Sequence, residues 1–271
     1  MEWWILILVG LVSGTVGSLV GLGGGIITVP ALLFLASTFP EYSQITPQVA
    51  VGTSLVLVII TALSSTFSYL RQKRVDFSSG LVFFVGSGPG AVLGAYLTNF
   101  FNPESFNIGF GILMILVAAL LTFQNRLKPP EVKWSVERKF IDAKGNIYRY
   151  GYHRPTALGM AFVVGTVSSL FGIGGGALMM PVMVLLFRFP PHVATATSML
   201  LIFLSSVMGS VTHMIQGNID WLAVLLIAPG AWLGGQAGAW LSNRMSGNGI
   251  LITLRLMIIG IAIKMVVDGL S

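Results

Sequence analysis

The chain has no cysteine in its 271 residues. This excludes disulfides, thiolate metal sites and any persulfide chemistry. Charge is scarce as well: Asp, Glu, Lys and Arg together make up 9% of the residues, whereas soluble domains average about 25%. A soluble protein of this length could not cover its surface with so few charged side chains, so the composition excludes an ordinary soluble domain.

Carboxylates are missing from the interior of the long apolar runs, because the acidic residues fall near the run ends or in loops. The carboxylate pairs of many cation and proton antiporters are therefore absent. The sequence also lacks a Ser/His/Asp set and histidines at metal-ligand spacing. We expect no enzyme activity, no metal site and no cofactor. The net charge of +6 lies mostly in residues 125–155, so it reports membrane topology and predicts no nucleic-acid partner.

Apolar residues, by contrast, make up 55% of the chain. A run of about 20 apolar residues can cross the roughly 30 Å hydrocarbon layer of a lipid bilayer. We therefore predict an all-α integral membrane protein. Its candidate membrane segments are residues 3–36, 49–70, 79–97, 106–123, 157–187, 193–215, 221–241 and 250–267.

A glycine-rich motif occurs twice. Residues 14–30 read Gly-Thr-Val-Gly-Ser-Leu-Val-Gly-Leu-Gly-Gly-Gly-Ile-Ile-Thr-Val-Pro, and residues 165–181 read Gly-Thr-Val-Ser-Ser-Leu-Phe-Gly-Ile-Gly-Gly-Gly-Ala-Leu-Met-Met-Pro. Two shorter motifs also recur, a Thr-Ser motif and a motif that begins Pro89-Gly90 in one copy and Pro229-Gly230 in the other. We therefore expect two homologous four-segment repeats, residues 1–124 and 156–271, joined by a basic insert at 125–155.

The insert has the pattern of a β-hairpin, with strand-forming residues on both sides of Lys144-Gly145-Asn146. It shares its excess of cations with Arg71, Lys73 and Arg74 in the loop after the second segment. The positive-inside rule places both in the cytoplasm. An ordinary charged linker is the alternative for the insert.

The basic residues change sides between the two halves. The loop at 216–220 aligns with the basic loop at 71–76 but has no Lys or Arg, whereas Arg188 and Arg244 fall in loops whose first-half counterparts have none. This exchange favours inverted repeats, each with a Gly-broken first segment that enters and leaves on one side of the membrane. Eight simple spans in two parallel repeats are the alternative.

Four glycines in five positions disfavour a continuous helix, because each costs about 1 kcal/mol relative to Ala. A half-helix that begins after such a break directs its free N–H groups and its positive dipole end at the break, where a small anion can bind. Close helix packing through small residues is the alternative. The glycines of this candidate substrate site are Gly23, Gly24, Gly25, Gly174, Gly175 and Gly176.

Hydroxyl side chains stand at equivalent places in the two halves, at Thr53 and Ser54 and again at Thr197 and Ser198. They are candidate donors to an oxyanion, or they bond only to the carbonyl one turn earlier in their own helix. Arg255 is a further candidate, about one and a half turns into its segment. It either contacts the substrate or extends to the membrane interface.

With these motifs duplicated over nearly the whole length, the chain resembles the sulfite exporter TauE/SafE family of membrane permeases. The resemblance implies a secondary transporter of small sulfur-containing anions, such as sulfite, thiosulfate or organosulfonates, in the plasma membrane of a prokaryote. It leaves the substrate and the direction of transport open.

We expect transport by alternating access between the two halves. Because no ATP-binding motif is present, the driving force is expected to be an ion gradient, with a coupling ion, or the gradient of the anion itself. The alternatives are a structural or regulatory membrane protein and an anion channel. The sequence does not predict the oligomeric state.

Overall fold

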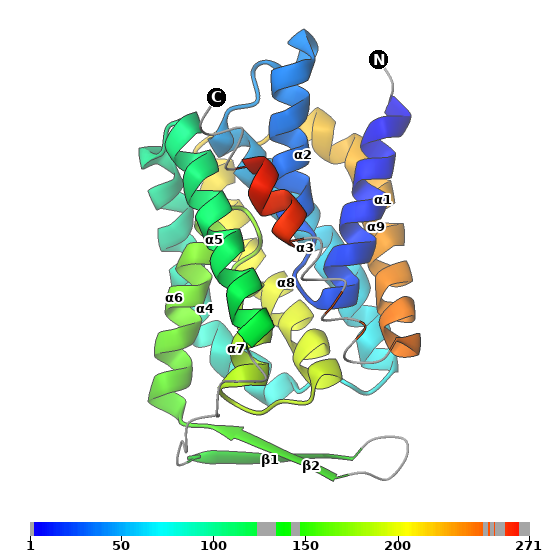
Figure 1. Ribbon diagram of the computed structural model, residues 1–271, viewed down its shortest axis with the longest axis vertical. Helices are drawn as coiled ribbons and strands as arrows, with labels where there is room; N and C mark the ends of the chain where they lie inside the picture. The colour runs from blue at the N-terminus through cyan, green and yellow to red at the C-terminus, as the bar shows by residue number, and fades with distance from the viewer. Residues whose placement is uncertain are drawn as a thin grey trace.

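The computed structural model describes residues 3–123, 134–141, 147–245, 249, 252 and 258–265. It is a bundle of α-helices with a two-stranded antiparallel sheet at one end (Figure 1). The helices before the insert are α1 (Trp3–Val20), α2 (Gly25–Thr38), α3 (Pro47–Arg71), α4 (Phe77–Leu97) and α5 (Pro103–Phe123), with short 3-10 turns at η1 (Pro40–Tyr42) and η2 (Thr98–Phe100). The later helices are α6 (Arg154–Leu170), α7 (Met179–Leu185), α8 (Pro191–Ile215) and α9 (Trp221–Arg244), followed by helical residues at 258–265.

Counting only the residues that the structure describes, four helices are long and apolar enough to cross a membrane: α3, α4 with its η2 extension, α8 and α9. Large apolar side chains project from the surface of these helices, for example Val85 on α4 and Leu225 on α9, which are 65% and 70% exposed. Such a surface is unfavourable in water and suits contact with lipid tails. The mostly helical, membrane-spanning architecture predicted from composition therefore agrees with the structure.

Helices α3 and α8 run in opposite directions through the centre of the bundle. Thr53, near the start of α3, accepts a hydrogen bond at 2.9 Å from the N–H of Asp220, which follows α8. Thr197, near the start of α8, accepts one at 3.0 Å from the N–H of Asp76, which follows α3. Each helix therefore begins beside the end of the other.

Glycines allow the outer helices to pack at close range. A Cβ atom on Gly230, Gly234 or Gly238 of α9 would lie 2.1, 2.4 or 2.1 Å from a carbonyl oxygen of α1. Three glycines of α4 approach carbonyl oxygens of α6 in the same way: Gly86, Gly90 and Gly94. Small residues are what bring helix backbones together in membranes.

These contacts correct one detail of the predicted repeat. The sequence motif pairs Gly90 with Gly230. In the structure, Gly230 contacts Ile7, whose equivalent in the second half, by the alignment of the glycine-rich motifs, is Leu158. Leu158 contacts Gly86 and not Gly90. Gly230 therefore takes the place of Gly86, one helical turn away from the predicted match. Helix–helix contacts fix this register, and the recurrence of Pro-Gly does not.

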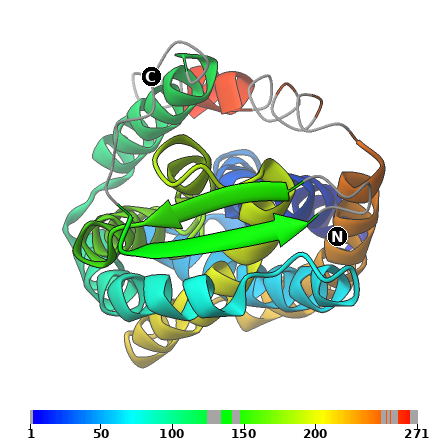
Figure 2. The ribbon, with the colours of Figure 1, turned by 90° about the horizontal axis from the view of Figure 1, so that it is seen from below.

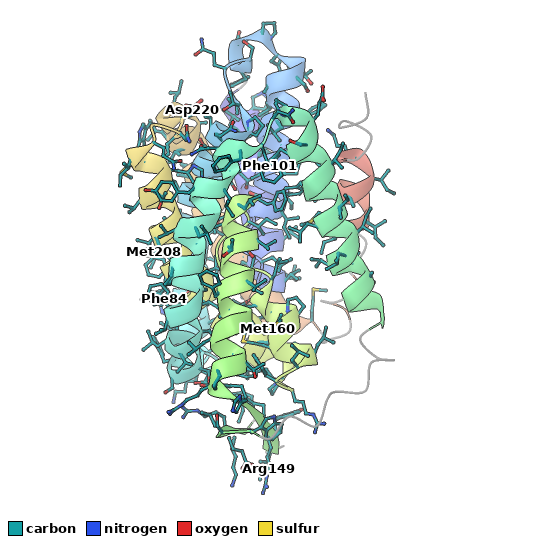
Figure 3. The ribbon with its side chains drawn as sticks, turned by 90° about the vertical axis from the view of Figure 1, so that its left-hand side faces the viewer. Phe84, Phe101, Arg149, Met160, Met208 and Asp220 are labelled. Carbon is teal, nitrogen blue, oxygen red and sulfur yellow. The ribbon has the colours of Figure 1, made fainter. Side chains whose placement is uncertain are left out.

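Strands β1 (Val136–Ile141) and β2 (Ile147–Tyr152) lie across one end of the bundle (Figure 2). They contact both halves of the chain: the hydroxyl of Tyr150 donates to the Asp76 carboxylate at 3.2 Å, and the N–H of Gly151 donates to the carbonyl of Phe187 at 3.1 Å. The turn predicted at residues 144–146 lies outside the described residues. Figure 3 places Asp220 at the opposite end of the bundle from Arg149 of β2.

Candidate functional site

The first glycine-rich motif contains a break at residues 21–24, between α1, which ends at Val20, and α2, which begins at Gly25. Gly21, Gly23 and Gly24 have φ values of +81°, +77° and +91°. This left-handed conformation is strained for other residues, so only glycine reverses the chain here without cost. Figure 1 shows α2 leading from this break toward the end of the bundle that lies away from the strands.

The second glycine-rich motif contains a break between α6 and α7, where residues 171–178 form no regular helix. Gly172 and Gly174 are left-handed, with φ values of +70° and +102°. The N–H groups of Gly172 and Ile173 still bond to carbonyls in the last turn of α6. All eight residues of this break are buried.

The two breaks touch each other where α3 and α8 cross. A Cβ atom on Gly25 would lie 2.2 Å from the carbonyl oxygen of Gly172. Val58 of α3 and Ile202 of α8 approach both breaks, because each lies 2.8–3.0 Å from the Cβ positions of Gly23 and Gly174. The glycines of the predicted site are therefore brought together in the interior of the bundle.

Each half supplies a serine that holds the break of the other half. Ser54 of α3 donates to the carbonyl of Gly172 at 2.8 Å, and Ser198 of α8 donates to the carbonyl of Gly21 at 2.8 Å. Both serines are fully buried. The structure thus brings Ser54 and Ser198 to the breaks, bonded to backbone oxygen. Arg255 lies outside the described residues.

Both breaks present backbone donors without acceptors. Among the described residues, the N–H groups of three consecutive positions in each break form no hydrogen bond: Gly24, Gly25 and Ile26, and Gly174, Gly175 and Gly176. Each unsatisfied N–H in a membrane interior costs several kcal/mol. Rows of such groups are suited to binding an anion.

Serines that the sequence interpretation did not single out line the second break. Ser206 Oγ is fully buried, has no hydrogen-bond partner, and lies 3.0 Å from the Cβ position of Gly174. Ser205 Cβ lies 2.6 Å from the Cβ position of Gly175, and its hydroxyl pairs with that of Ser87 on α4 at 2.6 Å. Hydroxyls and free N–H groups therefore lie close together in this region.

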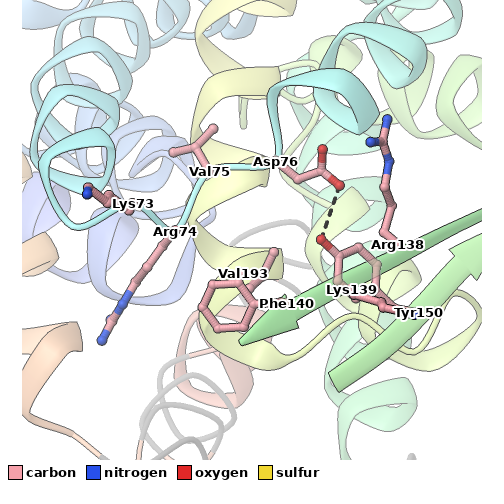
Figure 4. A pocket seen from close by; sticks show the side chains of 9 residues that line it. All are labelled: Lys73, Arg74, Val75, Asp76, Arg138, Lys139, Phe140, Tyr150 and Val193. Carbon is pink, nitrogen blue, oxygen red and sulfur yellow. Dashed lines mark hydrogen bonds between the residues drawn. The ribbon is translucent and has the colours of Figure 1, made fainter. Parts of the chain in front are cut away.

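A second polar region is a cavity of about 220 Å³ beside the strands (Figure 4). The Asp76 carboxylate in its wall caps α4 and accepts the hydroxyl of Tyr150. Burial, and then the charge of Asp76, raise the pKa of Tyr150 above its usual value. Burial also lowers the pKa of Arg74. Four cations line this cavity beside the one carboxylate of Asp76, and such an excess of positive charge attracts anions from solution. The cations are Lys73, Arg74, Arg138 and Lys139.

Several apolar helices that can cross a membrane, with unpaired polar groups buried between them, are the features of a multi-pass membrane protein with a polar interior. The chain belongs to the sulfite exporter TauE/SafE family, whose model matches residues 6–265. This confirms the family that the repeated motifs indicate and the membrane location that the composition predicts.

Relatives across bacteria and archaea have the same general designation. The chain is 48% identical to the probable membrane transporter protein YunE of Bacillus subtilis, covering 100% of this chain and 99% of the relative. It is 26% identical to a probable membrane transporter protein of Xylella fastidiosa, covering 95% and 92%, and 28% identical to one of Methanocaldococcus jannaschii, covering 78% and 72%. No solved structure matches the chain.

Proposed function

We propose that the protein is a secondary transporter of small sulfur-containing anions, such as sulfite, thiosulfate or organosulfonates. The observation that carries the proposal is the two rows of unpaired N–H groups, at Gly24–Ile26 and at Gly174–Gly176, buried where the breaks meet. An oxyanion supplies acceptors to several of these donors at once. The name of the family supports sulfur as the central atom.

We infer that the two halves are inverted repeats that move against each other in alternating access. The contacts between them come in equivalent pairs: Ser54 with Gly172 and Ser198 with Gly21. The opposite directions of α3 and α8 are what inversion requires. Separation of the halves on one side would release one serine from its carbonyl and leave the other bonded.

The hydroxyls of Thr53 and Thr197 take part in the same scheme. In this structure, in which both breaks are buried and which we call the closed arrangement, they accept the N–H groups of Asp220 and Asp76, and their own hydrogens stay available. We propose that these hydrogens, and those of Ser54 and Ser198, turn toward the anion when the halves separate. Arg255 stays a sequence prediction of a further contact.

Transport by purified protein in liposomes tests the proposal. We expect saturable uptake of radiolabelled sulfite, thiosulfate or methanesulfonate, accelerated by a pH gradient, a membrane potential or counter-anion inside the vesicles. Uptake that does not saturate and follows the potential alone would identify a channel. Uptake equal to that of protein-free vesicles under every gradient would refute transport of these anions.

Labelling of single cysteines tests the inversion, because the chain has none of its own. Asn218→Cys lies in the loop before α9, and Arg149→Cys lies on β2 at the other end of the bundle. An impermeant thiol reagent applied to intact cells should label position 218 and not position 149. Protection of both positions, with labelling only after lysis, would favour parallel repeats.

A further inference from the structure

The surroundings of the two breaks differ in polarity. The second break lies beside the hydroxyls of Ser206, Ser205 and Ser87. In the repeat defined by Thr53 and Thr197, the positions equivalent to Ser206 and Ser87 are Ala62 and Ala231. The first break therefore lacks two of these three hydroxyls. It has a different one, that of the buried and unpartnered Thr195, but the side-chain atom of Thr195 nearest to Gly21 is its methyl carbon, 3.1 Å from the Cβ position of Gly21.

The hydroxyls at the second break have donors to spare. Ser206 Oγ has no partner among the described residues although it is fully buried. In the pair formed by Ser205 and Ser87, only one hydroxyl donates to the other, so the second keeps a free hydrogen. A buried donor without an acceptor costs about 1–3 kcal/mol. These hydroxyls lie next to three free N–H groups, and a ligand with several acceptor atoms could satisfy all of these donors.

We propose that the transported anion binds at the second break, on the N–H groups of Gly174–Gly176 and the hydroxyls of Ser206 and the Ser205–Ser87 pair. This inference rests on the proposed function and deepens it, because it assigns the site to one of two similar breaks. The N–H groups belong to the loop after α6, so they are held by the left-handed Gly172 and Gly174 and by the end of α6.

The same surroundings select the charge of the anion. Within the part of the chain that the structure describes, the nearest side chains to Gly174 and Gly175 are serines and apolar residues, and none of them is a cation. Dipoles alone compensate one buried negative charge far better than two, because the cost of burying an ion rises steeply with its charge. The substrate class is therefore a singly charged anion with several oxygen acceptors, such as hydrogensulfite or an alkanesulfonate. Dianions bind more weakly at such a site, so sulfate is a poor ligand and thiosulfate the weakest of the substrates named under the proposed function.

Substitution of Ser206 tests the position of the site. Ser206→Ala should raise the KM for methanesulfonate in proteoliposomes at least about fivefold, as expected for one lost hydrogen bond, with little change in kcat. Thr66→Val is the matched control, because it removes another buried and unpartnered hydroxyl, two turns beyond Val58 on α3. Ala62→Ser, at the equivalent place beside the first break, should leave the KM unchanged.

Competition tests the charge. Methanesulfonate should inhibit sulfite uptake at concentrations at least about tenfold lower than sulfate does. Raising the pH, which converts hydrogensulfite to the dianion, should slow sulfite uptake and leave methanesulfonate uptake unchanged. A wild-type KM in Ser206→Ala, or stronger inhibition by sulfate, would overturn this inference while transport itself persisted. Absence of all transport in the wild type would instead refute the proposed function.

Discussion

The two glycine breaks are anchored in the same way but built to different lengths. Four residues separate α1 from α2, whereas eight separate α6 from α7, and α7 has 7 residues against 14 in α2. Each break nevertheless offers a carbonyl to a buried serine of the opposite half, at 2.8 Å in both cases. This serine–carbonyl bond, which we call the anchor, is thus common to both breaks. The breaks differ in their length and in the hydroxyl side chains that surround them. We infer that these serine–carbonyl bonds hold the two halves together until they separate, and that the longer break supplies most of the groups that bind the anion.

Substitution of one glycine in each break should have the largest effect. In Gly175→Ala, the added methyl would lie 2.6 Å from Ser205 Cβ and 2.9 Å from Ala91 Cβ, so it disturbs the wall without forcing a left-handed residue. We expect transport to fall at least about tenfold, equivalent to 1.4 kcal/mol. Gly24→Ala places a methyl 2.7 Å from the Ser13 carbonyl oxygen at a φ of +91°, so it should also lower the melting temperature.

Gly159→Ala on α6 is the control for both, because no atom lies within 4 Å of its Cβ position. The measurements are initial uptake rates in proteoliposomes and melting temperatures in detergent. Wild-type rates in both break variants would remove the substrate site from this region. A fall in rate in Gly24→Ala alone, with Gly175→Ala unaffected, would reverse our assignment of the binding role to the second break.

Removal of the anchors should have a smaller and symmetrical effect. Ser54→Ala leaves the buried carbonyl of Gly172 unpaired, and Ser198→Ala does the same to Gly21. We expect each to destabilise the closed arrangement by about 1–3 kcal/mol, seen as similar falls in melting temperature. Ser37→Ala on α2, whose exposed hydroxyl bonds only to Phe34, should change little. A large loss in one anchor variant beside no loss in the other would contradict the equivalence of the two halves.

The repeat in the sequence was sufficient to find the glycines and serines that the structure brings together. Left-handed conformations at Gly21 and Gly23 of the first copy, and at the equivalent Gly172 and Gly174 of the second, explain why glycine stands at these two positions in both copies. The partners of Ser54 and Ser198 could not be predicted, because each lies more than a hundred residues away in the chain. The sequence predicted that these serine hydroxyls either donate to a ligand or bond to a carbonyl of their own helix. In the structure each one bonds to a carbonyl of the other half.

Ser206 was missed for a different reason. A search for repeated motifs selects what the halves have in common, and Ser206 corresponds to Ala62. Its signal was a polar residue deep in an apolar helix at a place where its counterpart is apolar. The alignment of α4 with its equivalent, α9, differs by one helical turn from the one predicted from the recurring Pro-Gly. The carbonyl contacts at Gly86 and Gly230 show which residues are equivalent.

The smallest effect is expected where the two ends of the bundle differ. Asp76 and Asp220 cap α4 and α9 in the same way, but only Asp76 also accepts a hydrogen bond from Tyr150 of β2. The pKa of Tyr150 in the folded protein lies above its usual value of about 10. The hydroxyl of Tyr150 therefore contributes its full stabilisation below about pH 10, and this stabilisation is lost as the pH rises further. Tyr150→Phe should cost about 0.5–1.5 kcal/mol at neutral pH and weaken this alkaline loss. Melting temperatures measured from pH 7 to 11 check both effects, with Tyr96→Phe as the control because Tyr96 is half exposed on α4. If Tyr150→Phe lost as much stability at high pH as the wild type, the contact of the strands with the bundle would not depend on this bond.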